Sequence, residues 1–201
     1  MFGEDYGLYG CGGGWMVNAW YFQYKNGAMK NSDYAYTSGT TKVESQCAHN
    51  SAKIVGKTKN WGDIDDIPSA KAKLATHPLS IAVDADGPFM WYTGGVLTAD
   101  AGCGTGINHA VVVVGYTEAD SNPTPDPDPE PQPQGNCNVH KWWHSCDAPA
   151  RRLADSNGNS NYWKIQNSWG TGWGDQGFIL IEITEGVGIC AMNSYMQWVE
   201  M

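Results

Sequence analysis

The sequence of 201 residues has no apolar run that approaches the roughly 18 residues of a membrane-spanning helix. Its first residues, MFGEDYGLYG, contain neither the basic region nor the apolar core of a secretory signal peptide. Basic residues are scarce too, since 12 Lys and Arg stand against 21 Asp and Glu and give a net charge of -9. An acidic surface disfavours nucleic acids and anionic membranes as partners. We therefore expect no nucleic-acid binding and no membrane span.

The sequence also lacks an N-x-[ST] glycosylation site, so glycosylation gives no independent support for secretion. Cysteine is present six times. An even number at wide spacing is typical of disulfides formed in an oxidising compartment, and a set of buried free thiols is the alternative. Composition alone leaves both open for Cys11, Cys47, Cys103, Cys137, Cys146 and Cys190.

Hydrophobic periodicity predicts helices first and strands later. Apolar residues recur at helical spacing in 14–26, and Pro68 opens a second, short helix. Alternating or continuous apolar runs then predict four strands, in 79–85, 109–116, 162–169 and 177–183. This order predicts an α+β fold with an antiparallel sheet or barrel in the second half.

One segment, SNPTPDPDPEPQPQGN (121–136), alternates proline with acidic or polar residues. Proline has no N–H to donate and fixes its own backbone, so the segment favours neither a helix nor a sheet. We expect it to be extended and solvated, as a spacer rather than a motif for proline-binding domains. It is interpreted as the start of a surface insertion over 117–161.

Two stretches combine the residue types that acid–base chemistry needs. His109 opens the run HAVVVVGY, and Asn167 ends YWKIQN, just before a turn that contains Trp169 and Trp173. A histidine serves as a base near neutral pH, and an amide oxygen can accept its second N–H and so fix its tautomer. A tryptophan over such a pair would exclude water. Taken singly, His109 suits a structural role and Asn167 a turn, but the two stretches together favour a catalytic pair.

NHAVVVVGY followed by YWKIQNSWGTGWGDQGF resembles the histidine and asparagine regions of papain-like cysteine peptidases, the papain and cathepsin L group. GCGGGW resembles the glycine-rich segment along that family's substrate cleft, and GICAM its last disulfide region. The resemblance implies a helical lobe and an antiparallel β-barrel lobe with a cleft between them. We assign 1–60 to the remainder of the helical lobe and 61–201 to the barrel lobe.

The resemblance also implies roles for individual residues. His109 would be the general base and then the acid, Asn167 would orient it, and Trp169 and Trp173 would support the pair. Gly13 and Gly14 would offer backbone hydrogen bonds to an extended peptide, because a glycine has no Cβ to block its approach. The pocket for the residue second from the scissile bond would be lined by Met16, Ala82, Asn108 and Tyr195.

The nucleophilic cysteine of this family is not found in the sequence. The family carries it in a C-G-[SA]-C-[WY] signature about 130–150 residues before the histidine, whereas Cys11 precedes His109 by only about 100 residues. No such signature occurs in the sequence. Counting back from His109 would place the nucleophile about 20–40 residues before Met1. Cys11 is therefore not expected to be the nucleophile.

Three explanations remain open. The sequence is an incomplete version of an active endopeptidase, the C-terminal part of a processed enzyme whose N-terminal piece is a separate chain, or a non-catalytic relative with a structural or partner-binding role. In each case this chain by itself is expected to be inactive. If it is completed, the substrate is a peptide or protein.

By the same resemblance Cys103 and Cys190 pair within the barrel lobe, whereas the family partners of Cys11 and Cys47 lie outside the sequence. In CNVHKWWHSC, Cys137, Cys146, His140 and His144 could bind zinc, but four ligands within ten residues are crowded for a tetrahedral site. A Cys137–Cys146 disulfide is the preferred interpretation. We expect no cofactor and no metal, and a secreted or lysosomal/vacuolar location.

Overall fold

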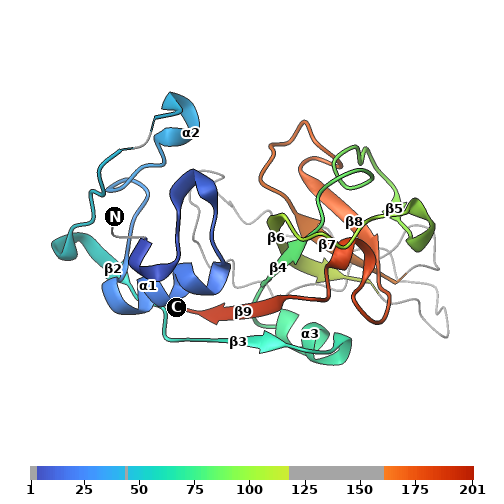
Figure 1. Ribbon diagram of the computed structural model, residues 1–201. Helices are drawn as coiled ribbons and strands as arrows, with labels where there is room; N and C mark the ends of the chain where they lie inside the picture. The colour runs from blue at the N-terminus through green and yellow to red at the C-terminus, as the bar shows by residue number, and fades with distance from the viewer. Residues whose placement is uncertain (1–3, 44, 118–160) are drawn as a thin grey trace, which may run out of the picture. The chain divides into compact units, whose positions relative to one another are not determined.

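The computed structural model describes residues 4–43, 45–117 and 161–201 (Figure 1). The chain divides into two compact units. Of the described residues, the first unit contains those up to Gly62 together with Val199–Met201, and the second contains 63–117 and 161–198. Each unit is described by itself below.

The first unit is built around α1 (Met16–Asn26), the helix expected from the apolar spacing. Trp20 is its buried residue, and the helix ends at Gly27, which adopts φ 81°. A side chain at Gly27 would also collide with Ile54, because a Cβ would lie 2.5 Å from Ile54 Cγ2. The turn-rich region after α1 contains a small antiparallel pair, β1 (Ala28–Met29) with β2 (Ile54–Gly56).

Short helical turns complete the described part of the first unit. They are η1 (Glu4–Tyr6), η2 (Gly10–Gly12), α2 (Ser38–Thr41) and η3 (Ser51–Lys53).

The second unit is dominated by a seven-stranded sheet in the order β3-β9-β4-β6-β7-β8-β5. The pairs β4–β6, β4–β9, β6–β7 and β7–β8 are antiparallel, and β5–β8 is parallel. The strands are β3 (Asn60–Ile64), β4 (Leu79–Val83), β5 (Val96–Leu97), β6 (His109–Tyr116), β7 (Tyr162–Gln166), β8 (Phe178–Glu182) and β9 (Met196–Glu200). Two further short helices are η4 (Ala99–Ala101) and η5 (Ile189–Ala191).

The helix α3 (Ile67–Leu74) contacts β4 and β6 of this sheet. Asp66 caps its first turn by accepting hydrogen bonds from the N–H and the hydroxyl of Ser69, at 2.7 and 2.8 Å. Pro68 follows in the first turn, where a missing N–H costs nothing. On its inner face Ala70 and Leu74 are fully buried.

The core of the second unit is made by inward-facing side chains of the strands. Leu79, Ile81 and Val83 of β4 alternate with partly or fully buried neighbours, and Trp163, Ile165, Ile179 and Ile181 extend the core through β7 and β8. The fold is α+β, as the order of predicted elements indicated. None of the helices in the described residues combines the length and apolar character needed to cross a bilayer.

Candidate active site

His109 and Asn167 meet because of the way β6 and β7 are paired. His109 is the first residue of β6, and Asn167 directly follows β7. Since the two strands are antiparallel, with Val112 opposite Gln166, the start of β6 and the end of β7 lie at the same edge of the sheet. His109 Nε2 is 2.8 Å from Asn167 Oδ1. The sheet thus joins two residues that the sequence keeps far apart.

The geometry fixes which nitrogen of His109 carries a proton. An amide oxygen can only accept, so Nε2 donates to Asn167 Oδ1 and Nδ1 is left as the basic atom of the neutral ring. Asn167 is buried, with 9% of its surface exposed, and its Oδ1 also accepts from the Ser168 N–H at 2.7 Å. Within the described residues its buried Nδ2 has no hydrogen-bond partner.

Aromatic rings surround this pair. Trp169 stacks on His109 with ring centres 4.9 Å apart and planes at 23°, and it remains 40% exposed. Phe89, fully buried, contacts both rings edge-on, at 6.4 Å from His109 and 5.9 Å from Trp169. Trp173 contacts Phe89 and Trp169, and its indole N–H donates to the Met90 carbonyl at 3.0 Å. Phe89 could not be predicted from the sequence, because no characteristic spacing links it to His109.

Three of the expected pocket residues lie in the second unit. Ala82 of β4 is buried, and its N–H donates to the Tyr195 carbonyl at 3.3 Å. Asn108 precedes His109, and its side-chain oxygen accepts from the Ala85 N–H at 2.9 Å. The Asn108 amide is therefore used to hold the neighbouring backbone.

The glycines and Met16 lie in the first unit. Gly13 adopts φ 88°, which suits a residue without Cβ, and Gly14 pairs with Leu8 in an isolated antiparallel bridge. A Cβ at Gly14 would lie 2.8 Å from the Leu8 side chain. Met16 begins α1. A substrate pocket that combines these residues with those of the second unit stays a prediction.

The cysteines fall into three groups. Cys103 and Cys190 form a disulfide in the second unit. Cys11 in η2 and Cys47 are free and exposed. The expected Cys137–Cys146 disulfide and the alternative zinc ligands His140 and His144 lie outside the described residues. In the described part, no group of His, Cys, Asp and Glu is arranged to hold a metal ion.

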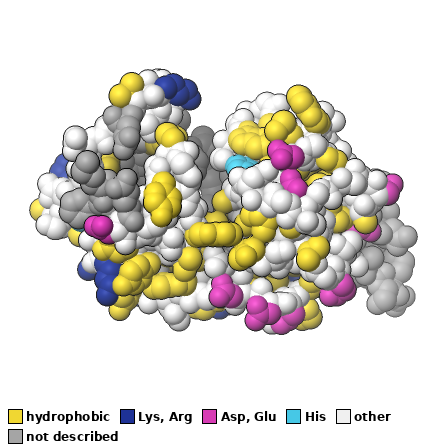
Figure 2. Space-filling view, in the orientation of Figure 1, with side chains coloured by type: hydrophobic (Ala, Val, Ile, Leu, Met, Phe, Trp, Pro, Cys, Tyr) yellow, Lys and Arg dark blue, Asp and Glu magenta, His cyan; other side chains and the backbone are white. Residues whose placement is uncertain are grey.

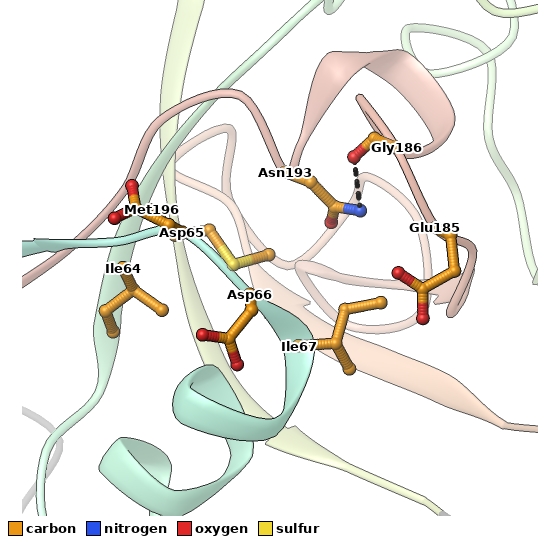
Figure 3. Close-up of a pocket in the computed structure, with 8 residues that line it drawn as sticks. All are labelled: Ile64, Asp65, Asp66, Ile67, Glu185, Gly186, Asn193 and Met196. Carbon is orange, nitrogen blue, oxygen red and sulfur yellow. Dashed lines mark hydrogen bonds between the residues drawn. The ribbon is translucent and has the colours of Figure 1, made fainter.

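A cavity of about 160 Å³ opens beside the start of α3 (Figure 3). Its polar side chains are acidic or amide: Asp65, Asp66 and Glu185, with Asn193 donating to the Gly186 carbonyl at 3.2 Å. The two hydrogen bonds from Ser69, the backbone one first, hold the pKa of Asp66 below its ordinary value. Neither His109 nor Asn167 lines this cavity, so it is separate from the histidine–asparagine pair.

Large apolar side chains also reach the surface (Figure 2). In the second unit Trp91, at 77% exposed, follows Met90 in the chain, and Met90 accepts the Trp173 hydrogen bond. An exposed aromatic side chain therefore lies one residue from the carbonyl that holds Trp173.

Comparison with known proteins identifies the family. Residues 3–199 match the model of the papain family of cysteine proteases. Among curated relatives, a senescence-specific cysteine protease of Oryza sativa is 31% identical over 196 residues, covering 94% of this chain and 44% of the relative. A cathepsin L-like proteinase of Fasciola hepatica is 27% identical over 192 residues, covering 94% and 46%. The chain thus spans less than half the length of these relatives.

Solved structures show the same similarity. The bromelain protease of Ananas comosus, in complex with the E64 inhibitor, matches with a TM-score of 0.69 and 25% identity over 96% of this chain and 72% of that one. Procathepsin L 3 of Tenebrio molitor matches with a TM-score of 0.70 and 25% identity over 99% of this chain and 52% of that one. The chain belongs to the papain family of cysteine proteases.

Proposed function

We propose that this chain supplies the acid–base part of a cysteine-type endopeptidase, with His109 as base and then acid and Asn167 as its orienting partner. The observation that carries the proposal is the 2.8 Å contact between His109 Nε2 and Asn167 Oδ1. That contact leaves Nδ1 as the basic nitrogen and allows it to take the proton of a thiol. Stacking by Trp169 supports the same role, because it limits access of water to the hydrogen bond.

The proposed reaction proceeds in two stages. His109 takes the proton of a cysteine thiol, and the thiolate attacks the peptide carbonyl carbon. The carbon–nitrogen bond breaks as the imidazolium gives its proton to the leaving amine, which leaves an acyl-thioester. His109 then takes a proton from water as its oxygen attacks the thioester carbon. The carbon–sulfur bond breaks, the carboxylic acid product leaves, and the imidazolium returns its proton to the sulfur, which restores the thiol.

The thiol in this proposal is not one of the six cysteines of the sequence. Cys103 and Cys190 are bonded to each other, and none of the six lies in a C-G-[SA]-C-[WY] signature. Cys11 and Cys47 are exposed and lie in the first unit. We assign the nucleophile to a cysteine outside these 201 residues, on the same polypeptide or on a separate chain.

The proposed substrate is an extended peptide or unfolded protein. Gly13 and Gly14 would bind its backbone, and Met16, Ala82, Asn108 and Tyr195 would line the pocket for the residue second from the scissile bond. A secreted or lysosomal/vacuolar location suits a chain that contains the Cys103–Cys190 disulfide.

A second candidate function is a non-catalytic papain-like module that binds a partner. The absence of the nucleophile signature from the sequence favours it. In that case the hydrogen bond between His109 and Asn167 would serve only to stabilise this edge of the sheet.

Hydrolysis of a denatured protein by the protein and its variants, expressed in the natural host, separates the two candidates. The endopeptidase proposal predicts cleavage that is lost in His109→Ala and retained in His77→Ala, a matched control because His77 contacts Trp198 instead of the site. Absence of cleavage favours the binding module, and equal cleavage by both variants would show that His109 is not the base of the reaction.

A further inference from the structure

Asp84 is a buried carboxylate that the proposed reaction does not use. It directly follows β4, and only 7% of its surface is exposed. No described Lys, Arg or His forms an ion pair with it, since the salt bridge found in the described residues joins Lys53 and Asp33. Burying a carboxylate without a cation is costly unless hydrogen bonds satisfy both of its oxygens.

Two backbone N–H groups from different segments meet this need. Oδ1 accepts from the Asp86 N–H at 3.1 Å, within the turn that follows β4. Oδ2 accepts from the Gly106 N–H at 2.9 Å, in the loop that leads into His109. The carboxylate therefore ties the end of β4 to the loop before β6.

Asn108 makes the reciprocal connection. Its side-chain oxygen accepts from the Ala85 N–H at 2.9 Å, and its own N–H donates to the Val83 carbonyl at 3.0 Å. Together with the Asp84 contacts, these hydrogen bonds connect the last residues before His109 to the end of β4 and the turn that follows it.

Gly104 shows how closely the carboxylate approaches this loop. A Cβ at Gly104 would lie 2.4 Å from Asp84 Oδ2, although its φ lies outside the left-handed region. Alanine is therefore compatible with the Gly104 backbone and is excluded only by the neighbouring carboxylate. Gly104→Ala would move the Asp84 carboxylate from its position but would not remove its negative charge.

A carboxylate is needed at position 84 because both oxygens accept from N–H groups. An asparagine has one accepting oxygen, so its NH₂ group would face either the Asp86 or the Gly106 N–H. Asp84→Asn would thus keep the side-chain volume and lose one of the two connections.

We propose that Asp84 is a positioning residue, which holds the 104–108 loop so that the His109 ring stays stacked on Trp169 and bonded to Asn167. Its importance for catalysis rests on the proposed function, but its effect on the position of His109 does not. The stacked contact supplies a direct measurement, since the ring current of Trp169 shifts the NMR signals of the His109 ring protons.

The test compares Asp84→Asn and Gly104→Ala with Asp86→Asn in the full chain. Asp86 is exposed, so its replacement removes an equal charge two residues away without touching the loop. Amide exchange at residue 86 and at Gly106 and the His109 ring signals, assigned with His109→Ala, are recorded together with the melting temperature. We expect exchange to be faster by about tenfold or more at Gly106 in Gly104→Ala, and at either Asp86 or Gly106 in Asp84→Asn, because a buried acceptor is lost. We also expect the His109 signals to move in both and to stay unchanged in Asp86→Asn.

Unchanged His109 signals in both test variants would overturn the proposal, even if exchange at Gly106 were faster or the melting temperature lower, because Asp84 would then only anchor the loop. If Asp84→Asn fails to fold, Gly104→Ala decides alone. Neither measurement involves peptide cleavage. Failure of this inference therefore leaves the endopeptidase proposal intact, and absence of cleavage leaves the His109 result intact.

Discussion

His109 Nε2 and Asn167 Oδ1 lie 2.8 Å apart, although 58 positions separate the two residues in the chain. The pairing of β6 with β7 produces this contact, since His109 begins one strand and Asn167 follows the other. Asn167 Oδ1 also accepts from the Ser168 N–H, and this second hydrogen bond holds the oxygen in place independently of His109. The orientation of the imidazole is therefore built into the sheet edge.

Asn167→Ala removes the acceptor of the His109 Nε2–H. In the natural protein with its nucleophile we expect the rate of peptide cleavage to fall about tenfold to hundredfold, because one hydrogen bond to a buried partner is lost. Gln166→Ala, at the exposed neighbouring position, is the control and should cleave normally. Cleavage by Asn167→Ala at the rate of this control would show that the amide does not orient the base.

Phe89→Ala removes a fully buried ring that contacts His109, Trp169 and Trp173. The expected loss in the free energy of unfolding is about 3–5 kcal/mol, from lost burial and the cavity left behind. Phe89→Leu keeps most of the volume and should lose less. Urea unfolding of both variants measures the difference, and equal stability of Phe89→Ala and the unsubstituted chain would refute the assigned packing.

Tyr92 makes stability depend on pH in the alkaline range. Burial raises the pKa of its hydroxyl above the ordinary 10.0, although the hydrogen bond from the Leu180 N–H acts in the opposite direction. The unfolded chain ionises first, so the stabilisation is complete below about pH 10 and is lost as the pH rises through the folded pKa. Thermal unfolding followed at several alkaline pH values should show this loss, and Tyr92→Phe should lack this contribution. A Tyr92→Phe variant with the same alkaline slope would contradict the assignment.

The Cys103–Cys190 disulfide joins residues 87 positions apart. Replacing both cysteines by serine should lower the free energy of unfolding by about 2–5 kcal/mol, chiefly because the unfolded chain is no longer cross-linked. Cys11→Ser with Cys47→Ser provides the matched control, since both thiols are free and exposed. Denaturant unfolding under non-reducing conditions distinguishes the pairs, and equal destabilisation by both would contradict the assigned roles.

Much of the fold could be predicted from periodicity, and the limits have physical causes. The helix at Met16–Asn26 and the strands β4, β6, β7 and β8 have clear apolar patterns. The prediction extended β7 to Trp169, but the strand ends at Gln166. β5 has two residues, too few for a pattern, and β3 is mostly polar or exposed at its start. Such strands are specified by their neighbours in the sheet.

The candidate site was predictable only in part. His109 and Asn167 carry a recognisable pattern, whereas Phe89 and Asp84 act through contacts between segments that have no fixed spacing. The hydrogen bond from the Ala85 N–H to the Asn108 side-chain oxygen was not predictable either, and the pocket role of Asn108 stays a prediction. A side chain's partner depends on the tertiary fold, which a sequence pattern does not encode.

The location of the reactive thiol decides whether His109 activates a cysteine outside these 201 residues. The natural protein is treated with an irreversible thiol-directed epoxide, and the modified cysteine is identified by peptide mass spectrometry. We expect modification at a cysteine outside the six in this sequence, and loss of that modification in His109→Ala but not in His77→Ala. Modification at Cys11 or Cys47 that depends on His109 would contradict it, as would labelling that is equal in both variants.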